Sequence, residues 1–200
     1  MSYSYIKLSI SIFFIVIFII YYYDYYNNNI KNMTYVKSDI NLREYKVRDL
    51  KDKTVASNTL ANLYQNIIIL VNFLDKNKEK YPDYKLYIDR LVEKTPYIKL
   101  SESHFNSEQT SYSVNKGEEL VFCLRSKFSN HIHDLNLLMY VCLHELAHVG
   151  CPIYDNHGEL FQKIFAFLTK IAIEINLYKH VDYDKNPVEY CGININSSII

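Results

Sequence analysis

Apolar residues recur at every third or fourth position over Val55–Asn77, which is the period of an amphipathic helix. Prolines on both sides set off a short second helix over Tyr84–Glu93. The run Glu118–Arg125 contains Val, Phe and Cys after an Asn-Lys-Gly turn, and it predicts a strand. Two more helices are expected over Leu135–Val149, which is apolar on nearly every side, and over Glu159–Tyr178, which is apolar on one face. This pattern predicts an α+β fold in which a small antiparallel or mixed sheet packs on a buried central helix.

The amino terminus carries a long uncharged apolar segment, Leu8–Tyr23. Together with residues 5–7, where the Lys7 amine can reach the headgroups, it has the length of a short or tilted transmembrane helix. The tyrosines at its end suit the membrane interface. We therefore expect residues 1–26 to be an uncleaved N-terminal signal anchor. The chain would then be a single-pass protein of a viral or host membrane, in contact with the bilayer through residues 5–23.

A cleaved signal peptide and a buried soluble helix are weaker interpretations of this segment. A cleaved signal peptide needs small residues at the cut site, and positions 21–34 contain neither Ala nor Gly. A soluble helix that is apolar all round needs a much larger core around it. The flanking charges do not settle which side of the membrane the rest of the chain faces.

The rest of the chain divides into a polar, irregular linker over 27–54 and one domain over 55–200. Inside that domain, the Ser/Glu/Asn-rich run 101–113 is expected to form a loop, and 181–200 an irregular tail. A chain of 200 residues has room for one ordinary domain and an appendage.

Charge and cysteine content narrow the possible functions. The 22 Lys and Arg residues balance the 22 Asp and Glu residues, so the composition gives no indication of nucleic-acid binding. The four cysteines form no C-x-x-C pair and are too few for a disulfide framework, so we expect small apolar core residues. They are Cys123, Cys142, Cys151 and Cys191.

The segment 144–148 reads His-Glu-Leu-Ala-His in the middle of the expected buried helix. Positions i and i+4 share a helix face, so His144 and His148 can direct two imidazoles at one metal ion, with Glu145 beside them. H-E-x-x-H is the zinc-binding pattern of metallopeptidases, in which the Glu is the general base. The competing hypothesis is a pair of core-edge histidines bonded to backbone carbonyls. The pattern favours one Zn²⁺ per chain, with His144 and His148 as ligands.

A catalytic zinc usually takes three protein ligands and keeps one position open. His157 is the best third ligand, because it lies nine residues after His148, at the start of the next expected helix. The alternatives are Asp155, Glu159 and Glu174.

These motifs resemble those of a known family. The run 144–148, followed by a short loop and His-Gly-Glu-Leu-Phe at 157–161, resembles the WLM/SprT-like zincin metallopeptidases, including members encoded by large DNA viruses. The turn and strand over 115–125 and the tail segment 186–192 are similar to the viral members as well. The resemblance covers roughly residues 110–192.

The resemblance implies a zincin-like fold with a zinc-binding active-site helix. It implies three zinc ligands, His144, His148 and His157. Glu145 would be the general base, and the strand over 118–125 would be the edge strand that pairs with an extended substrate. The spacing departs from the metzincin pattern, because Tyr154 stands where that pattern has its third His and no Met-turn follows.

Taken together, these features predict a membrane-anchored, zinc-dependent metallopeptidase that hydrolyses peptide bonds of a protein or peptide substrate, with a water molecule activated by Glu145. Tyr190, in the carboxyl tail, is a second candidate catalytic residue, as a donor to the oxyanion. The alternative function is an anchored, non-catalytic binding module that a metal stabilises.

Overall fold

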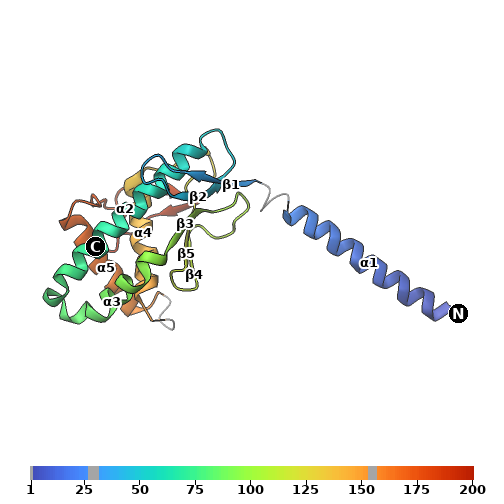
Figure 1. Ribbon diagram of the computed structural model, residues 1–200, viewed down its shortest axis with the longest axis horizontal. Coiled ribbons are helices and arrows are strands. Elements are labelled where there is room, and N and C mark those ends of the chain that lie inside the picture. Colours follow the sequence, from blue (N-terminus) through green and yellow to red (C-terminus); the bar gives the residue numbers. More distant parts are fainter. Residues whose placement is uncertain (1, 27–31, 153–156) are drawn as a thin grey trace.

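A computed structural model describes residues 2–26, 32–152 and 157–200 (Figure 1). The helices are α1 Ser2–Tyr25, α2 Lys53–Asn77, α3 Lys85–Lys94, α4 Leu135–Gly150 and α5 Glu159–Glu174. One sheet contains β1 Met33–Lys37, β2 Glu44–Arg48, β3 Lys99–Glu102, β4 Tyr112–Val114 and β5 Glu119–Phe122. A separate hairpin consists of β6 Val188–Tyr190 and β7 Ile193–Ile195. The expected α+β class with a mixed sheet is confirmed.

The sheet has the order β1-β2-β3-β5-β4. Its three central strands, β2, β3 and β5, run parallel, and β1 and β4 are added antiparallel at the two edges. β5 is the strand expected over 118–125, and it lies between β3 and β4. The prediction that this strand forms the edge is therefore wrong. β4 occupies the edge, within a segment that was expected to be a loop.

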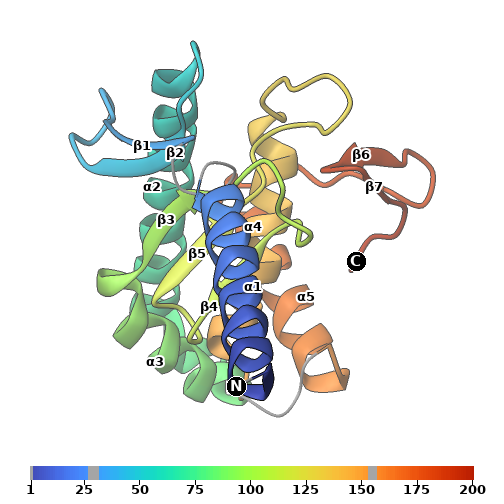
Figure 2. The ribbon, with the colours of Figure 1, turned by 90° about the vertical axis from the view of Figure 1, so that its right-hand side faces the viewer.

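Helices cover one face of the sheet (Figure 2). α2 lies against β1, β2 and β3, α4 lies against β4, and the two helices contact each other. The positions Leu60, Leu63 and Ile67 of α2 are fully buried, as their helical spacing predicted. α5 packs along α4 on the side away from α2. α4 is thereby enclosed between two helices and the sheet, which explains why it is apolar on nearly every side.

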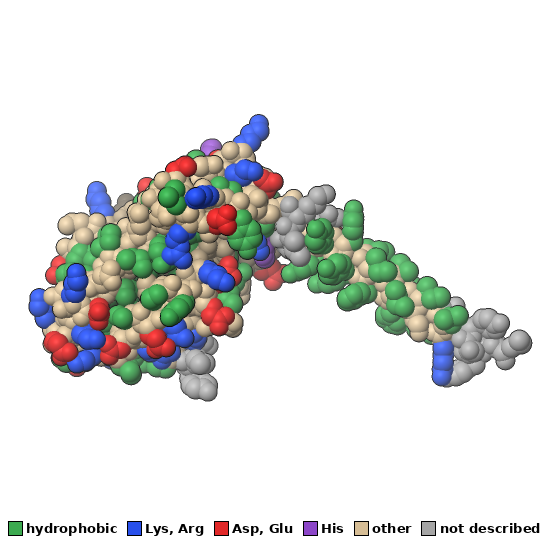
Figure 3. Space-filling model, in the orientation of Figure 1, with side chains coloured by type: hydrophobic (Ala, Val, Ile, Leu, Met, Phe, Trp, Pro, Cys, Tyr) green, Lys and Arg blue, Asp and Glu red, His purple; other side chains and the backbone are tan. Residues whose placement is uncertain are grey.

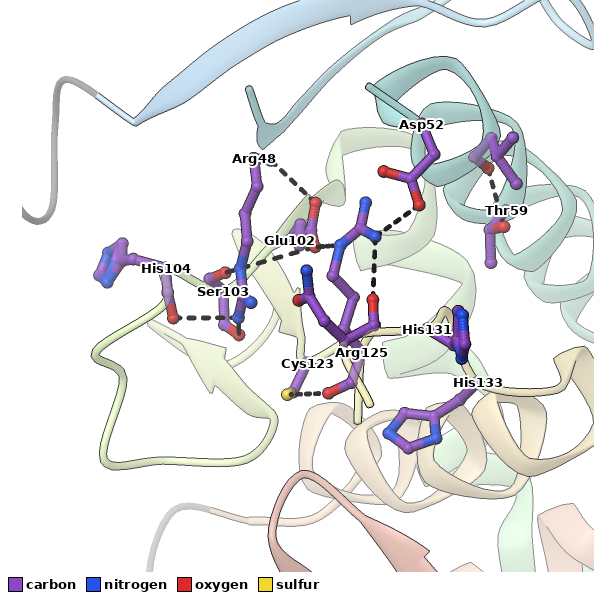
Figure 4. Close-up of polar contacts among 12 residues, drawn as sticks. Arg48, Asp52, Thr59, Glu102, Ser103, His104, Cys123, Arg125, His131 and His133 are labelled. Carbon is purple, nitrogen blue, oxygen red and sulfur yellow. Dashed lines mark hydrogen bonds and ion pairs between the residues drawn. The ribbon is translucent and has the colours of Figure 1, made fainter. Parts of the chain in front are cut away.

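A buried ion network joins strands that are distant in the sequence (Figure 4). The Glu102 carboxylate at the end of β3 accepts hydrogen bonds from the Arg48 backbone N–H and from Arg125 Nε, both at 2.8 Å. Arg125 also donates to Asp52, at the start of α2, over 2.6 Å. The side chains of Arg125 and Glu102 are almost completely buried. The network therefore ties β2, β3, the segment after β5 and the start of α2 together.

The prediction of an irregular linker over 27–54 is wrong for residues 33–37 and 44–48. β1 and β2 form an antiparallel hairpin in this interval, and β2 continues the main sheet through its pairing with β3. The physical reason is the alternation in β2, where Tyr45 and Val47 face the core and are buried. The domain that contains the site thus includes residues 33–48. The tail over 181–200, expected to be irregular, also contains the β6–β7 hairpin.

The prediction of an N-terminal signal anchor is wrong. Among the residues that the structure describes, no helix is both long and apolar enough to cross a membrane. From Leu8 to Ile20, α1 is only about 20 Å long at 1.5 Å per residue, against a hydrocarbon core of about 30 Å. Lys7 precedes this stretch, and the tyrosines at 21–23 and Asp24 follow it.

α1 projects from the rest of the molecule, and apolar side chains line its visible surface (Figure 3). On the same face of the remaining structure, acidic, basic and apolar side chains are interspersed. This mixture agrees with the balanced charge of the sequence.

Candidate metal centre

α4 carries the His-Glu-Leu-Ala-His segment on the side that faces α5. The helix begins where the sequence predicted, because the Asp134 side chain accepts a hydrogen bond from the Asn136 N–H over 2.8 Å. Tyr140, His144 and His148 follow one another at intervals of four residues and therefore share one face. The two imidazoles are only partly buried, whereas the residues around them in α4 are buried.

Three imidazole nitrogens converge at this face. The Nε2 atom of His148 lies 3.3 Å from Nε2 of His144 and 3.0 Å from Nε2 of His157, and the third pair is 3.2 Å apart. Three nitrogens that bind one tetrahedral zinc at 2.0–2.1 Å are expected to lie about 3.3 Å from one another. The three histidines therefore fit a single zinc ion. They form a group that could hold a metal ion.

His157 reaches the other two histidines through the packing of α5. It immediately precedes Gly158, the residue before the first turn of α5. Phe161, one turn into the helix, lies under all three rings, with ring centroids 4.9 Å from His144, 4.3 Å from His148 and 4.8 Å from His157. The apolar face of α5 thus fixes the position of the loop histidine.

Burial keeps the α4 histidines neutral. Burial, together with the neighbouring imidazoles, lowers the pKa of His144 to about 3 and that of His148 to about 4. Neutral imidazole is the form that binds a metal ion. The protein therefore presents these two side chains in the ligand form at neutral pH.

Glu145 lies between the two helical histidines in the sequence and is 3 % exposed. Burial raises its pKa to about 8, since the protein interior disfavours the charged carboxylate. A carboxyl group with a pKa near neutrality can both accept and donate a proton at working pH, which is the property of a general acid–base.

A cleft of about 970 Å³ opens over this group. One wall is the segment 110–113, which leads into and includes part of β4, and the opposite wall is the tail 193–199 after β6. The floor is made by α4 and α5, including the three histidines, Glu145, Tyr140 and Phe165. A cleft of this size, which combines aromatic and aliphatic side chains with convergent polar groups, is typical of a substrate site.

Tyr190 lines the same cleft, although it is distant in the sequence from α4. Its hydroxyl forms a hydrogen bond of 2.5 Å with Ser111 Oγ, and its ring is almost fully buried. Burial raises the pKa of Tyr190, and the nearby Glu145 carboxyl raises it further, so its hydroxyl remains protonated. The structure thus brings Tyr190 and Glu145 into one site.

Of the alternative third ligands, Glu159 and Glu174 do not join the group. Asp155 lies outside the described residues. Glu159 is exposed and forms an ion pair of 2.6 Å with Lys163, one turn along α5. Glu174 is exposed at the other end of α5.

Three features near the site were missed from the sequence. Ser111 was expected in a loop, but it lies beside the edge strand and contacts Tyr190. The ring centroid of His133 lies 5.1 Å from that of Tyr190. Cys123 and Cys191 form a disulfide, so the expectation that all four cysteines are merely apolar core residues is wrong for this pair.

Comparisons with known proteins give three viral relatives. The chain is 46 % identical to the uncharacterized protein R325 of Acanthamoeba polyphaga mimivirus over 167 residues, which is 84 % of each chain. It is 33 % identical to the uncharacterized protein 136R of Invertebrate iridescent virus 6 over 81 residues, 40 % of this chain and 44 % of the relative. It is 39 % identical to the uncharacterized protein 042R of Invertebrate iridescent virus 3 over 71 residues, 36 % of this chain and 43 % of the relative.

No family model matches the chain. Among solved structures, Wss1 from Saccharomyces cerevisiae is similar, with a TM-score of 0.45 and 20 % sequence identity. The similarity covers 66 % of this chain and 88 % of that chain. Similarity at this level says nothing of the activity, which has to follow from the residues of the site.

Proposed function

The chain belongs to the family of the uncharacterized protein R325 of Acanthamoeba polyphaga mimivirus, and we propose that it is a zinc-dependent peptidase. The observation that carries this proposal is the convergence of three imidazoles beside a buried carboxyl group in one cleft. The resemblance of residues 110–192 to the WLM/SprT-like zincins supports the same function. His144, His148 and His157 would hold the zinc through their Nε2 atoms.

A zinc ion at this place supplies a Lewis acid that polarises a carbonyl group and acidifies a water molecule. Glu145 is the base that accepts the proton of the attacking water and returns it to the leaving amine.

Tyr190 is proposed as the donor to the oxygen that becomes negative when water attacks the substrate. Its hydroxyl is protonated and held at a fixed point of the cleft by Ser111. A fixed donor of this kind stabilises the transition state more than the ground state, because it need not reorganise during the reaction.

The substrate is proposed to bind as an extended strand along β4. Among the described residues this strand pairs with β5 alone, so the backbone groups on its other side can pair with a peptide. Residues 110–113 line the cleft, so a peptide added at this edge would pass over the histidines. β4 thereby takes the role that the sequence had assigned to 118–125.

Metal analysis tests the first half of the proposal. The full chain, purified without added metal chelator, should contain about one zinc per chain, and His144→Ala should lose it because two remaining ligands bind zinc far more weakly. The matched control is His131→Ala, since this exposed histidine lies outside the group and its removal should leave the zinc content unchanged. A wild-type chain without zinc would contradict the proposal.

Cleavage of a peptide library tests the second half. Glu145→Gln should keep the zinc and the fold but lose cleavage by a factor of roughly 10² to 10⁴, as expected when a general base is removed. A zinc-bound wild type that cleaves no member of the library would favour the alternative, a metal-stabilised binding module.

A further inference from the structure

A disulfide joins the central sheet to the wall of the cleft. Cys123, directly after β5, is bonded to Cys191 in the β6–β7 turn, with the two Cα atoms 6.2 Å apart and a sequence separation of 68 residues. Both residues are almost completely buried. In the part of the chain that the structure describes, the hairpin has no strand pairing with the main sheet, and isolated two-stranded hairpins are marginally stable in water. A covalent bond at its turn is therefore a strong constraint on where it lies.

The same two cysteines are both connected to Tyr190, one through the chain and one through Ser111. Tyr190 precedes Cys191 in the chain, and its hydroxyl bonds to Ser111 Oγ, which in turn accepts the N–H of Cys123 over 3.1 Å. A closed ring results: Tyr190 to Cys191 by the peptide bond, Cys191 to Cys123 by the disulfide, and Cys123 back to Tyr190 through Ser111. His133 borders it, and its Nε2 accepts the Cys191 N–H over 3.4 Å.

This closed ring of covalent and hydrogen bonds also includes a residue with an unfavourable backbone conformation. Cys191 has a φ of +53°, in the left-handed region that residues other than glycine rarely adopt, and Gly192 follows with a φ of +84°. These two residues reverse the chain between β6 and β7. Without the bond to Cys123, the turn at Cys191 would lose the contact that compensates this strain.

We propose that the Cys123–Cys191 disulfide and Ser111 are a redox-sensitive positioning device for Tyr190. In the oxidised protein the hairpin is fixed and the Tyr190 hydroxyl points into the cleft. In the reduced protein the hairpin leaves its place and peptide hydrolysis slows. The effect on hydrolysis rests on the proposed peptidase function, whereas the effect on the hairpin does not.

The redox step needs two electrons from a reductant. A phosphine attacks one sulfur, the S–S bond breaks, and the second sulfur leaves as a thiolate that takes a proton from water. Water then displaces the first sulfur as a thiol, and the phosphine becomes a phosphine oxide. A phosphine serves better than a dithiol as the probe, because thiolates also bind zinc.

The first test measures the hairpin and does not depend on activity. Under denaturing conditions the oxidised full chain should expose two thiols, from Cys142 and Cys151, and four after treatment with tris(carboxyethyl)phosphine. Amide hydrogen exchange over 186–196 should accelerate at least tenfold on reduction, while exchange in α4 should not change. Four thiols before treatment, or unchanged exchange over 186–196, would overturn the proposal.

The second test measures catalysis. Reduction should lower kcat for a cleaved peptide roughly 10- to 100-fold with little change in KM, since a displaced donor weakens the transition state more than substrate binding. Ser111→Ala should act similarly without reductant, and Ser111→Thr, which keeps the hydroxyl, should restore most of the rate. The double variant Cys123→Ser, Cys191→Ser should be slow and unresponsive to the phosphine.

The two tests separate the possible failures. If the oxidised wild type cleaves nothing while exchange over 186–196 still responds to reduction, the peptidase function fails and the redox-sensitive hairpin stands. If the oxidised wild type cleaves and its kcat is unchanged by reduction and by Ser111→Ala, the positioning role is wrong.

Discussion

Almost all of the buried residues of α4 are apolar. Three polar side chains interrupt this pattern: Glu145 is buried, and His144 and His148 are partly buried. The protein interior disfavours charge, so burial raises the pKa of the Glu145 carboxyl group and lowers the pKa values of the two imidazoles. All three groups are therefore neutral near pH 7 in the metal-free protein. A divalent cation reverses this preference for the carboxyl group, because a nearby positive charge favours the carboxylate.

The raised pKa of Glu145 predicts a specific pH dependence of stability in the metal-free protein. Glu145 titrates near 4.5 in the unfolded chain and near 8 in the folded one. Between these values the folded state binds the proton more strongly, so the stability that Glu145 contributes is present below pH 4.5 and is lost as the pH rises to 8. The total change should be roughly 4–5 kcal/mol.

Urea denaturation of metal-free wild type and Glu145→Gln between pH 4.5 and 8 measures this effect. The difference in unfolding free energy between the two proteins should shift against the wild type as the pH rises. The histidine contributions run in the opposite direction, but they are common to both proteins and cancel in the difference. A difference that stays constant with pH would contradict the prediction.

At the scale of elements, the turn between β4 and β5 shows how a strand edge is fixed next to the active-site helix. Gly117 has a φ of +106°, and a Cβ atom there would lie 2.9 Å from Cγ1 of Val149 near the end of α4. The turn is therefore pressed against the helix one residue beyond His148. The absence of a side chain permits this approach and sets the distance between the strand wall and the floor of the cleft.

Gly117→Ala should lower the free energy of unfolding by about 1–3 kcal/mol, through backbone strain and contact with Val149. Urea denaturation measures it. The matched control is Gly150→Ala, where the added Cβ meets its nearest atoms at 3.7 Å within a helix, so the change should be neutral or stabilising by up to about 1 kcal/mol. Equal effects of the two substitutions would exclude the contact with Val149 as the cause.

The buried ion network around Glu102 predicts a larger loss in the free energy of unfolding. Glu102→Ala removes the carboxylate between Arg48 and Arg125 and leaves buried guanidinium groups without their partner, which should cost roughly 3–5 kcal/mol in urea denaturation. The control is Lys185→Ala, because this exposed lysine pairs with Asp182 at the surface and should contribute less than about 1 kcal/mol. A small loss for Glu102→Ala would mean that the network is not a major source of stability.

The helices could be predicted from the sequence and most of the strands could not. α2 and α4 have long runs of apolar residues at helical spacing, and these runs were interpreted correctly. β1, β3 and β4 have three to five residues each, and part of their burial comes from neighbouring strands rather than from their own alternation. Such short segments acquire their structure from pairing between distant parts of the chain, which one sequence does not display.

At the scale of the whole molecule, α1 differs from the remaining structure in the burial of its side chains. The described side chains of α1 are exposed, whereas the core is made by α2 to α5 and the strands. α1 therefore has no part in the core that supports the histidines.

Removal of residues 1–26 should leave both the zinc content and the free energy of unfolding unchanged within about 0.5 kcal/mol, because no core residue is lost. Metal analysis and urea denaturation of residues 27–200 measure this. The control is residues 49–200, which lack β1 and β2 with their buried Tyr45 and Val47 and should be strongly destabilised. Loss of zinc from 27–200 would show that α1 contributes to the site.

The sequence by itself determined the helix that carries His144, Glu145 and His148, because their relative positions follow from the period of one helix. It also pointed to His157. Only the tertiary structure decided that three Nε2 atoms meet within about 3 Å, that β4 is the edge of the sheet, and that Tyr190 is tied to the cleft by Ser111 and a disulfide. The physical reason is the distance along the chain over which each interaction acts. Spacing within a helix is local, whereas strand order and contacts across 68 residues arise only when the whole core packs.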